Sequence, residues 1–530
     1  MKRLLRSLLL VLPLTLYFSF WPVIRLGGNE SMNFELSLPL VWLVLFDLMG
    51  LVALARERKL FDWARGRRWL WLLFPVWLSL TVIWSLNPIR GLLTVGILWL
   101  LYFAGYTMWA LRESWNDAFW ITWWKWFFGA ALLVCGWCVV QCILDLVGVG
   151  QDYSLMCDGC TYHMFGFPHP NGFAIEPQFM GNLLLAPAIA TAWLYSRGDC
   201  NGAFRGRGSS RPSLRGSDPS SLGRNLRKPL KTLLPVASQE SYDNGSCSLC
   251  SIFLLVCFFI ITATLFLTFS RGAIYAFVVG MLFMSGFVVF GAKKRERGGL
   301  WKRVGMVWGL VILSFVVVLN LQGLMAEVGP TNDSYSDGVA KVLNHLSLGV
   351  IEIKGDDVMK RDEGMGNTEG ELVNDEFVVV EKPVENFDGS AKDSSKKEEA
   401  VFDGYVAEST DTRVRLSGAA VQVWSQSVPN ALFGVGLGGA GYALYNNGLS
   451  PAPKEIVQNE YASLLLETGL IGVSLLVLTL VLIVRVVWKN DSRAMVLGLL
   501  LAYGVSLVFF SGLPNALHIY LLPAVMIMVV

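Results

Sequence analysis

One arginine of this sequence stands where it could hold a phosphate group. Arg271 lies in the tetrapeptide Phe269-Ser270-Arg271-Gly272, between two long apolar runs. So short a turn places the side chain at a membrane surface, where a planar guanidinium pairs well with the phosphate oxygens of a lipid. The same place suits an arginine that merely anchors the turn at the interface. Both interpretations keep Arg271 at the edge of the hydrocarbon.

Acidic and basic side chains also stand at the start of the apolar run that begins near residue 173. His169 and Pro170-Asn171 come just before it, and Glu176 lies just inside it. Desolvation near a membrane surface raises the pKa of a carboxyl, and a carboxylate so tuned suits general-base catalysis. Alternatively, Glu176 only complements the positive end of the following helix.

A third polar cluster, Gln458-Asn459-Glu460, opens a later apolar run. Asn459 is a suitable N-cap for a helix that starts there. Glu467 follows two turns into the run, where a charged residue needs a partner or a polar cavity. Shortly before this cluster, Gly434, Gly436 and Gly438 form a glycine-rich turn that permits left-handed backbone angles and close approach to a ligand.

The elements that must position these residues are membrane helices. Of the 530 residues, 54% are hydrophobic and 16% charged, with a mean hydropathy of +0.51, whereas soluble domains carry about 25% charged residues. This composition excludes a soluble enzyme, and the net charge of +2 gives no indication of nucleic-acid binding.

A helix needs about 20 apolar residues to cross a bilayer, and a lipid-exposed backbone must satisfy its own hydrogen bonds. The fold class predicted is therefore an all-α polytopic integral membrane protein with about 12 transmembrane helices. The predicted helices are 7–25, 36–54, 69–87, 91–111, 118–147, 173–196, 251–269, 272–291, 304–324, 460–484, 494–511 and 515–530.

The loops alternate in basic charge along the whole chain. Arg and Lys crowd the segments near 56–68, 197–231, 293–303 and 485–493, while the intervening short loops hold few. Because cytoplasmic loops are the basic ones, we expect both termini to be cytoplasmic and the first run to be an uncleaved helix.

The predicted organisation has five parts. Residues 1–196 form transmembrane helices 1–6, 197–250 a basic disordered cytoplasmic loop, 251–324 helices 7–9, 325–459 a large outer loop and 460–530 helices 10–12.

The outer loop itself divides in two. Its part 352–412 is acidic and predicted to be disordered, and 413–459 bears the motifs, with Arg415 to Ser427 expected as an amphipathic helix on the membrane surface. In another outer loop, Cys157 and Cys160 form a disulfide or remain free thiols, because zinc would require further ligands.

Three motifs in order resemble the O-antigen ligase and polymerase family, the Wzy_C-type membrane glycan transferases related to WaaL. They are Ser270-Arg271-Gly272, then Arg415 followed by Trp424 and Phe433-Gly434-Val435-Gly436-Leu437-Gly438, then Gln458-Asn459-Glu460-Tyr461 continuing to Glu467-Thr468-Gly469-Leu470-Ile471-Gly472. The resemblance covers about 251–291 and 413–485.

This resemblance implies a GT-C-like fold in the bacterial inner (cytoplasmic) membrane. It implies transfer of a glycan, with inversion, from a polyprenyl (undecaprenyl) diphosphate carrier to a glycan or lipid acceptor on the outer face, without a metal ion or other cofactor. Arg271 and Arg415 would bind the diphosphate, and Gly434, Gly436 and Gly438 would shape the loop above it.

The sequence departs from the family at one position. Where ligases have a histidine as base, this chain has Gln458, which can orient a hydroxyl but cannot take its proton near neutral pH. Three explanations stand: a polymerase-like member that needs no histidine, another base among Glu460, Glu176 and His169, or loss of catalysis.

Two other function classes fit the same topology. A polysaccharide or lipid-linked glycan transporter would share the helix count and an outer polar cavity, and a non-catalytic family member would account for Gln458. Transporters tend to have broken helices with polar groups at the midplane, whereas the polar residues here gather on the outer side.

Overall fold

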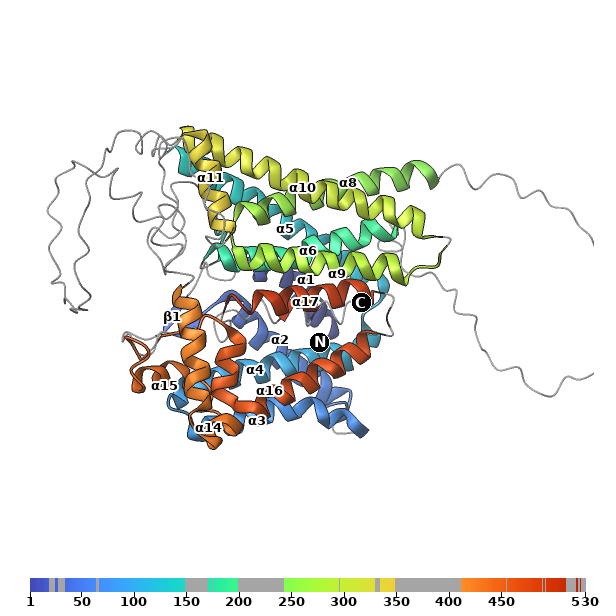
Figure 1. The fold of residues 1–530 in the computed structure, drawn as a ribbon. Helices are drawn as coiled ribbons and strands as arrows, with labels where there is room; N and C mark the ends of the chain where they lie inside the picture. Colours follow the sequence, from blue (N-terminus) through green and yellow to red (C-terminus); the bar gives the residue numbers. More distant parts are fainter. Residues whose placement is uncertain are drawn as a thin grey trace, which may run out of the picture.

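The computed structural model describes most of the chain and gives it a helical architecture (Figure 1). The residues described are 1–18, 24–26, 34–62, 66–147, 170–174, 176–198, 243–294, 296–328, 334–347, 411–453, 455–488, 490, 492–510, 521–522 and 525.

Long apolar helices make up the body of the molecule. Their bounds are α1 Lys2–Tyr17, α2 Leu38–Arg56, α3 Leu73–Thr81, α4 Pro88–Ala110, α5 Asp117–Leu146, α6 Pro177–Arg197, α8 Asp243–Leu267, α9 Arg271–Gly291, α10 Arg297–Val328, α16 Glu460–Val487 and α17 Arg493–Ser506.

Shorter elements join them or gather at one end. They are the strands β1 Ile24–Leu26 and β2 Phe34–Leu36, the 3₁₀ turns η2 Gly66–Leu72, η3 Val82–Trp84 and η4 Arg112–Ser114, and the helices α11 Tyr335–Leu346, a helix over 411–425, α14 Val428–Phe433 and α15 Ala440–Asn446.

Seven helices among the described residues are long and apolar enough to cross a membrane: α2, α4, the 118–144 part of α5, α6, α9, α10 and α16. Three shorter apolar stretches accompany them, at 69–84, 251–267 and 493–506. The outward sides of α10 and α16 are lined with exposed residues such as Ile312 and Val477, as lipid contact requires. The chain is a multi-pass membrane protein, and the predicted count of 12 is not confirmed.

Several predicted boundaries differ from the structure. The first helix ends at Tyr17 rather than near residue 25, because residues 24–26 form the strand β1, which pairs antiparallel with β2. The third predicted helix, 69–87, is instead α3 between the 3₁₀ turns η2 and η3. Helix α8 begins at Asp243, so residues 243–250 are helical rather than part of the predicted disordered loop. Residues 199–242 lie outside the described ranges.

The helices form two groups that meet along α1 and α17. Figure 1 shows α5, α6, α8, α9 and α10 on one side and α2, α3, α4 and α16 on the other. Helix α17 packs on α9 and α6, and α1 packs on α5 and α2. Small residues permit this closeness: a Cβ on Gly280 of α9 would lie 2.7 Å from the Ala502 Cβ of α17. Helix α6 is almost wholly buried at the centre.

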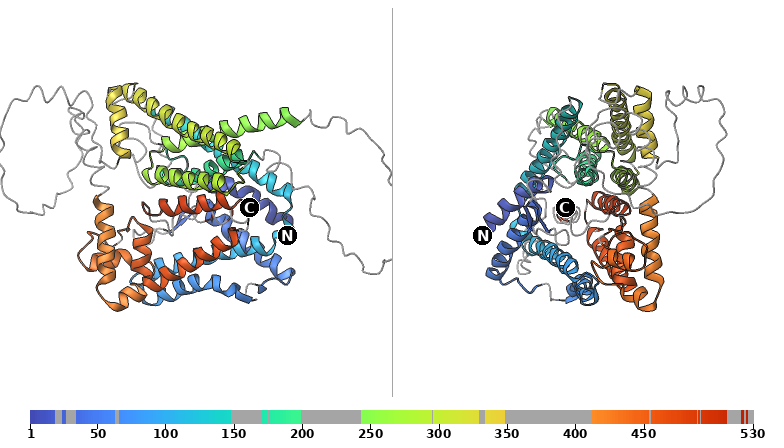
Figure 2. Two further views of the ribbon diagram at one scale, coloured as in Figure 1. Left: turned by 45° about the vertical axis from the view of Figure 1, so that its right-hand side comes forward. Right: turned by 90° about the vertical axis from the view of Figure 1, so that its left-hand side faces the viewer.

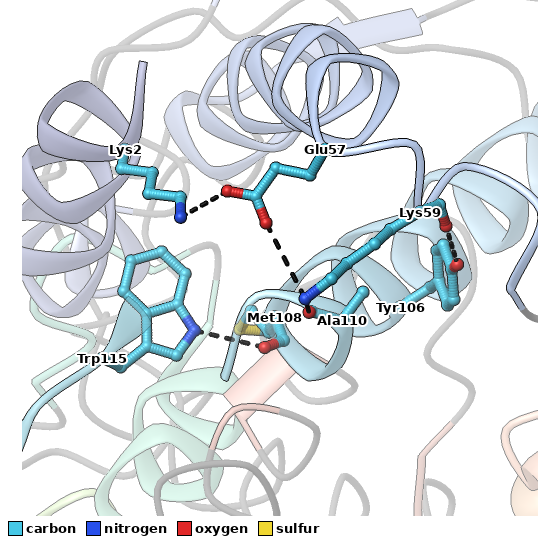
Figure 3. A network of polar contacts seen from close by, with 7 residues as sticks. All are labelled: Lys2, Glu57, Lys59, Tyr106, Met108, Ala110 and Trp115. Carbon is cyan, nitrogen blue, oxygen red and sulfur yellow. Dashed lines mark hydrogen bonds and ion pairs between the residues drawn. The ribbon is translucent and has the colours of Figure 1, made fainter. Parts of the chain in front are cut away.

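The two ends of the bundle differ. Helices α11, α14, α15 and 411–425 gather at one end, called the loop end below, and Met1 lies toward the other (Figures 1 and 2). At that opposite end, Glu57 beyond α2 pairs with Lys2 of α1 and lies 3.7 Å from Lys59 (Figure 3). The Lys59 ammonium also donates to the Ala110 carbonyl of α4 at 3.2 Å. These contacts tie together the ends of α1, α2 and α4.

Candidate active site

The entry to α6 is held by a buried amide pair. Gln141 of α5 donates to the Asn171 side-chain oxygen at 3.1 Å and accepts from the Gly172 N–H at 2.9 Å. The Asn171 amide in turn donates to the Ala174 carbonyl at 3.1 Å. These contacts hold residues 171–174 in place, shortly before Glu176, the N-cap of α6.

Arg271 is the first residue of α9 and only 6% exposed. Ser270 caps this helix by accepting the Ala273 N–H at 3.3 Å, and Phe269 just before it has a φ of +48°. A Cβ on Gly272 would lie 2.9 Å from the Phe509 Cβ and 3.4 Å from the Gln178 amide nitrogen of α6. The arginine turn is therefore packed against the entry of α6.

The helix over 411–425 packs its apolar face against the protein. Leu416, Ala420 and Val423 are buried against Leu444 of α15 and other apolar side chains. This apolar face covers protein, so the predicted amphipathic helix is present but does not use that face to lie on a membrane surface.

The two arginines of this helix differ in environment. Arg413, three residues before Leu416, lies at one edge of the inward face and is partly buried. Arg415 is exposed on the other side.

Arg413 links two of the residues singled out in the sequence. Its Nε–H donates to the Gln458 side-chain oxygen at 2.6 Å, and its charge acts on Glu176. Glu176 keeps contact with solvent, but partial desolvation by the surrounding protein raises the pKa of its carboxyl, and Arg413 acts in the opposite direction. A carboxylate, a guanidinium and an amide thus lie close together at the loop end.

Residues 507–510, after α17, bind the helix entries to one another. The Glu460 N–H donates to the carbonyls of Leu507 at 2.9 Å and Phe510 at 3.2 Å. Gln178 of α6 donates to the Phe509 carbonyl at 3.0 Å. Since Phe509 also packs against the arginine turn, the first turns of α6, α9 and α16 converge here. Asn459 caps α16, as predicted, by accepting the N–H groups of Tyr461 and Ala462 at 3.1 Å each.

The glycine-rich turn approaches the chain's own backbone. Gly434, Gly436 and Gly438 have φ values of +74°, +91° and +81°. A Cβ on Gly434 would lie 2.4 Å from the Glu467 backbone, and one on Gly436 would lie 2.3 Å from the Ser85 Cα. The turn is therefore wedged between α16 and the connection from α3 to α4.

Hydrogen bonds fix this wedge on both sides. Ser85 donates to the Leu437 carbonyl at 2.6 Å and the Trp84 indole to the Gly434 carbonyl at 3.2 Å. On the α16 side, Gly436 donates to the Glu467 carbonyl at 3.0 Å. The kink of α16 at Gly469, with φ +65° and ψ −172°, makes room for Leu432.

Glu467 has the partners that its depth requires. Its carboxylate accepts the Ala440 N–H at 3.3 Å and an N–H from Gly438, and the Arg90 charge is close by. Glu467 therefore has a structural role, because its carboxylate holds the glycine turn against α16.

The structure thus brings Glu176 and Gln458 together through Arg413, and Arg271 and Glu460 together through residues 507–510. Sequence reasoning overlooked Arg413, Arg90 and Phe509. Arg413 lies just before the predicted helix Arg415 to Ser427, and the spacing of apolar residues gave no reason to prefer it to Arg415. His169, Cys157, Cys160 and the acidic stretch up to residue 410 lie outside the described residues.

Comparison with known proteins supports the resemblance. Residues 256–477 match the family model Wzy_C, described as O-antigen ligase. A comparison of the chain with curated proteins gives no match. The matched region runs from α8 into α16 and contains the arginine turn, the helix with Arg413, the glycine turn and the Gln458-Asn459-Glu460 cluster. Residues 256–477 are therefore similar to the O-antigen ligase domain of the Wzy_C type.

Proposed function

We propose that this protein transfers a glycan from a polyprenyl (undecaprenyl) diphosphate carrier to a glycan or lipid acceptor, as an O-antigen ligase or polysaccharide polymerase. The observation that supports this most directly is the contact of Arg413 with Gln458, the family's histidine position, beside Glu176. The family match supports the class of reaction.

Arginines would hold the diphosphate. Arg271 starts α9, where the helix N-terminus adds its own affinity for anions, and Arg413 faces the same corner of the bundle. Arg415, exposed on the helix over 411–425, would draw the carrier headgroup in from the membrane surface. Bidentate arginine contacts stabilise the negative charge that grows on the diphosphate as it leaves.

Glu176 would act as the base. It takes the proton of the acceptor hydroxyl while the hydroxyl oxygen forms a bond to the anomeric carbon. The bond from that carbon to the diphosphate oxygen breaks, and polyprenyl diphosphate leaves with the electron pair. A carboxyl with a raised pKa suits this step better than one with an ordinary value. Gln458 would orient the hydroxyl or Arg413, and Glu460 is the alternative base.

The loop end would face the periplasm. Basic loops lie at the opposite end of the bundle. They favour a cytoplasmic location for that opposite end and for both termini, in the bacterial inner membrane. The carrier would then reach the site sideways from the outer leaflet, and Gly434, Gly436 and Gly438 would support the loop above it.

Reconstitution tests the proposal. The protein in liposomes is given a polyprenyl-diphosphate oligosaccharide, alone and with candidate acceptors, and products are followed by gel and mass spectrometry. Arg413→Ala is compared with Arg485→Ala, a matched loss of an exposed arginine in the last turn of α16.

Each outcome has a distinct meaning. A ladder of lengthening lipid-linked glycans that requires Arg413 but not Arg485 establishes a polymerase, and a single transfer to an added acceptor establishes a ligase. Substrate that stays chemically unchanged but crosses the bilayer would support a transporter instead. Absence of both would contradict the proposal and favour a non-catalytic protein.

A further inference from the structure

The carboxyl-terminal end of α11 packs over the turn that carries Arg271. Helix α11 lies along α10, where the Tyr335 hydroxyl donates to the Asn320 side-chain oxygen at 2.6 Å. A Cβ on Gly338 would lie 2.6 Å from the Ala326 Cβ of α10, so the two helices are in close contact. This close contact fixes α11 at the loop end and carries its last residues to the start of α9.

His345, in the last turn of α11, contacts the arginine turn directly. Its side chain is 5% exposed, and its Nε2 lies 3.0 Å from the Phe269 carbonyl oxygen. Because a carbonyl can only accept, the imidazole must carry its proton on Nε2 in this contact. Phe269 has a φ of +48°, an unfavourable angle for a residue with a side chain. The hydrogen bond from His345 holds the turn in that strained conformation.

A second contact joins α11 to α9, one turn after Arg271. The Tyr275 hydroxyl donates to the Leu346 carbonyl, at the end of α11. Tyr275 is one turn after Arg271 on α9 and lies within range of its charge. The end of α11 therefore contacts the chain on both sides of Arg271 in the sequence. His345 contacts Phe269, which precedes Arg271, and Leu346 contacts Tyr275, which follows it.

We propose that His345 is a positioning residue for the diphosphate-binding arginine. Through the Phe269 carbonyl it fixes the backbone that aims Arg271 at the carrier headgroup. This inference rests on the proposed function, since it assigns Arg271 to the diphosphate. Helix α11 thereby becomes part of the site although none of its side chains needs to touch the substrate.

The test is a double-mutant cycle with two readouts. His345→Leu, Arg271→Ala and the double variant are compared with the unaltered protein for glycan transfer in liposomes and for binding of undecaprenyl diphosphate in nanodiscs. Loss of one hydrogen bond is expected to weaken binding and kcat/KM by about three- to tenfold. His345→Gln, which keeps an N–H donor, is expected to restore most of this loss.

The cycle separates positioning from general destabilisation. If His345 acts through Arg271, His345→Leu has no further effect once Arg271 is alanine. Tyr335→Phe, which removes a hydrogen bond at the opposite end of α11, serves as the matched control and is expected to leave both readouts unchanged.

The failures of the two proposals are distinguishable. Binding that depends on His345 and Arg271 without any transfer would overturn the proposed function but support the positioning role. Additive effects in the cycle, equal losses in Tyr335→Phe, or undecaprenyl diphosphate binding that is indifferent to both residues would overturn the positioning role.

Discussion

Two arginines only two residues apart have different environments in this protein. Arg413 is partly buried and donates to Gln458, and Arg415 is exposed on the other side of its helix. An exposed charge acts through a screened field, while a partly buried, hydrogen-bonded guanidinium acts on nearby groups with little screening. The two side chains should therefore affect different steps of transfer.

Single alanine variants test this difference. We expect Arg413→Ala to lower kcat by about a hundredfold or more, because a charge that stabilises the leaving group is lost. Arg415→Ala should raise KM by about three- to tenfold at low salt and less at high salt. Kinetics at two ionic strengths measure both effects, and equal losses of kcat in the two variants would argue against the assignment.

The carboxyl of Glu176 predicts a pH dependence. A base is active only when deprotonated, so activity should fall as the pH decreases through the raised pKa of Glu176, at a higher pH than the ordinary value of about 4.3 would give. Arg413 lowers this pKa, so Arg413→Gln should move the acid limb of the residual activity to higher pH. Profiles of kcat/KM from about pH 4 to 8 show this.

Two substitutions at position 176 supply the control. Glu176→Gln should remove most of the activity together with the acid limb, and Glu176→Asp should retain a limb with lower activity. An acid limb that persists unchanged in Glu176→Gln would transfer the role of base to Glu460 or another group.

At this scale the sequence showed which residue types could do chemistry, but not which of two arginines faces the site. Arg271 and Glu176 stood out because each adjoins a helix start. The orientation of Arg413 depends on Leu416 and Val423 packing against Leu444. Segments separate in sequence decide that contact, so the local pattern could not rank Arg413 above Arg415.

At the scale of elements, the kink of α16 and the glycine turn form one joint. Gly469 adopts φ +65° and ψ −172°, a region open essentially to glycine alone. A Cβ there would lie 2.3 Å from the Leu432 carbonyl oxygen. The turn can dock only if this position has no side chain.

We therefore expect Gly469→Ala to destabilise the protein by more than about 2 kcal/mol, from backbone strain together with the clash. Gly309→Ala in α10 is the matched control, because a Cβ there meets nothing within 4 Å and alanine favours a helix. Thermal unfolding in detergent compares the two. Equal melting temperatures for Gly469→Ala and the unaltered protein would show that docking of the glycine turn at the α16 kink does not require glycine at position 469.

Helix positions were largely predictable from apolar length, and helix ends were not. Runs such as 118–147 and 272–291 fall within a residue or two of α5 and α9. Between Tyr17 and Leu38, however, Ile24–Leu26 and Phe34–Leu36 form paired antiparallel strands, and the pairing of Ile24 with Leu36 replaces helical hydrogen bonds. Such pairings depend on a partner strand, which hydropathy along one segment does not reveal.

For the whole molecule, the alternation of basic loops predicts which end of the bundle faces the periplasm. Asn447, at the loop end, should be accessible from outside, and Asn490, between α16 and α17, only from the cytoplasm. Cysteines introduced singly at these positions, in intact cells treated with a membrane-impermeant maleimide, test the orientation. We expect added labelling at Asn447→Cys before permeabilisation and at Asn490→Cys only afterwards. The reverse result would invert the topology.

The wedged glycine turn also imposes an order on biosynthesis. The Trp84 indole binds the Gly434 carbonyl, and these residues are 350 positions apart in the chain. At about 5–20 residues per second, the ribosome needs roughly 20–70 s to make the intervening stretch. During that interval the connection between α3 and α4 has already emerged but has no docking partner. The nascent protein must therefore keep Trp84 and Ser85 accessible until almost all of its helices have been made, so the joint closes as one of the last events of assembly.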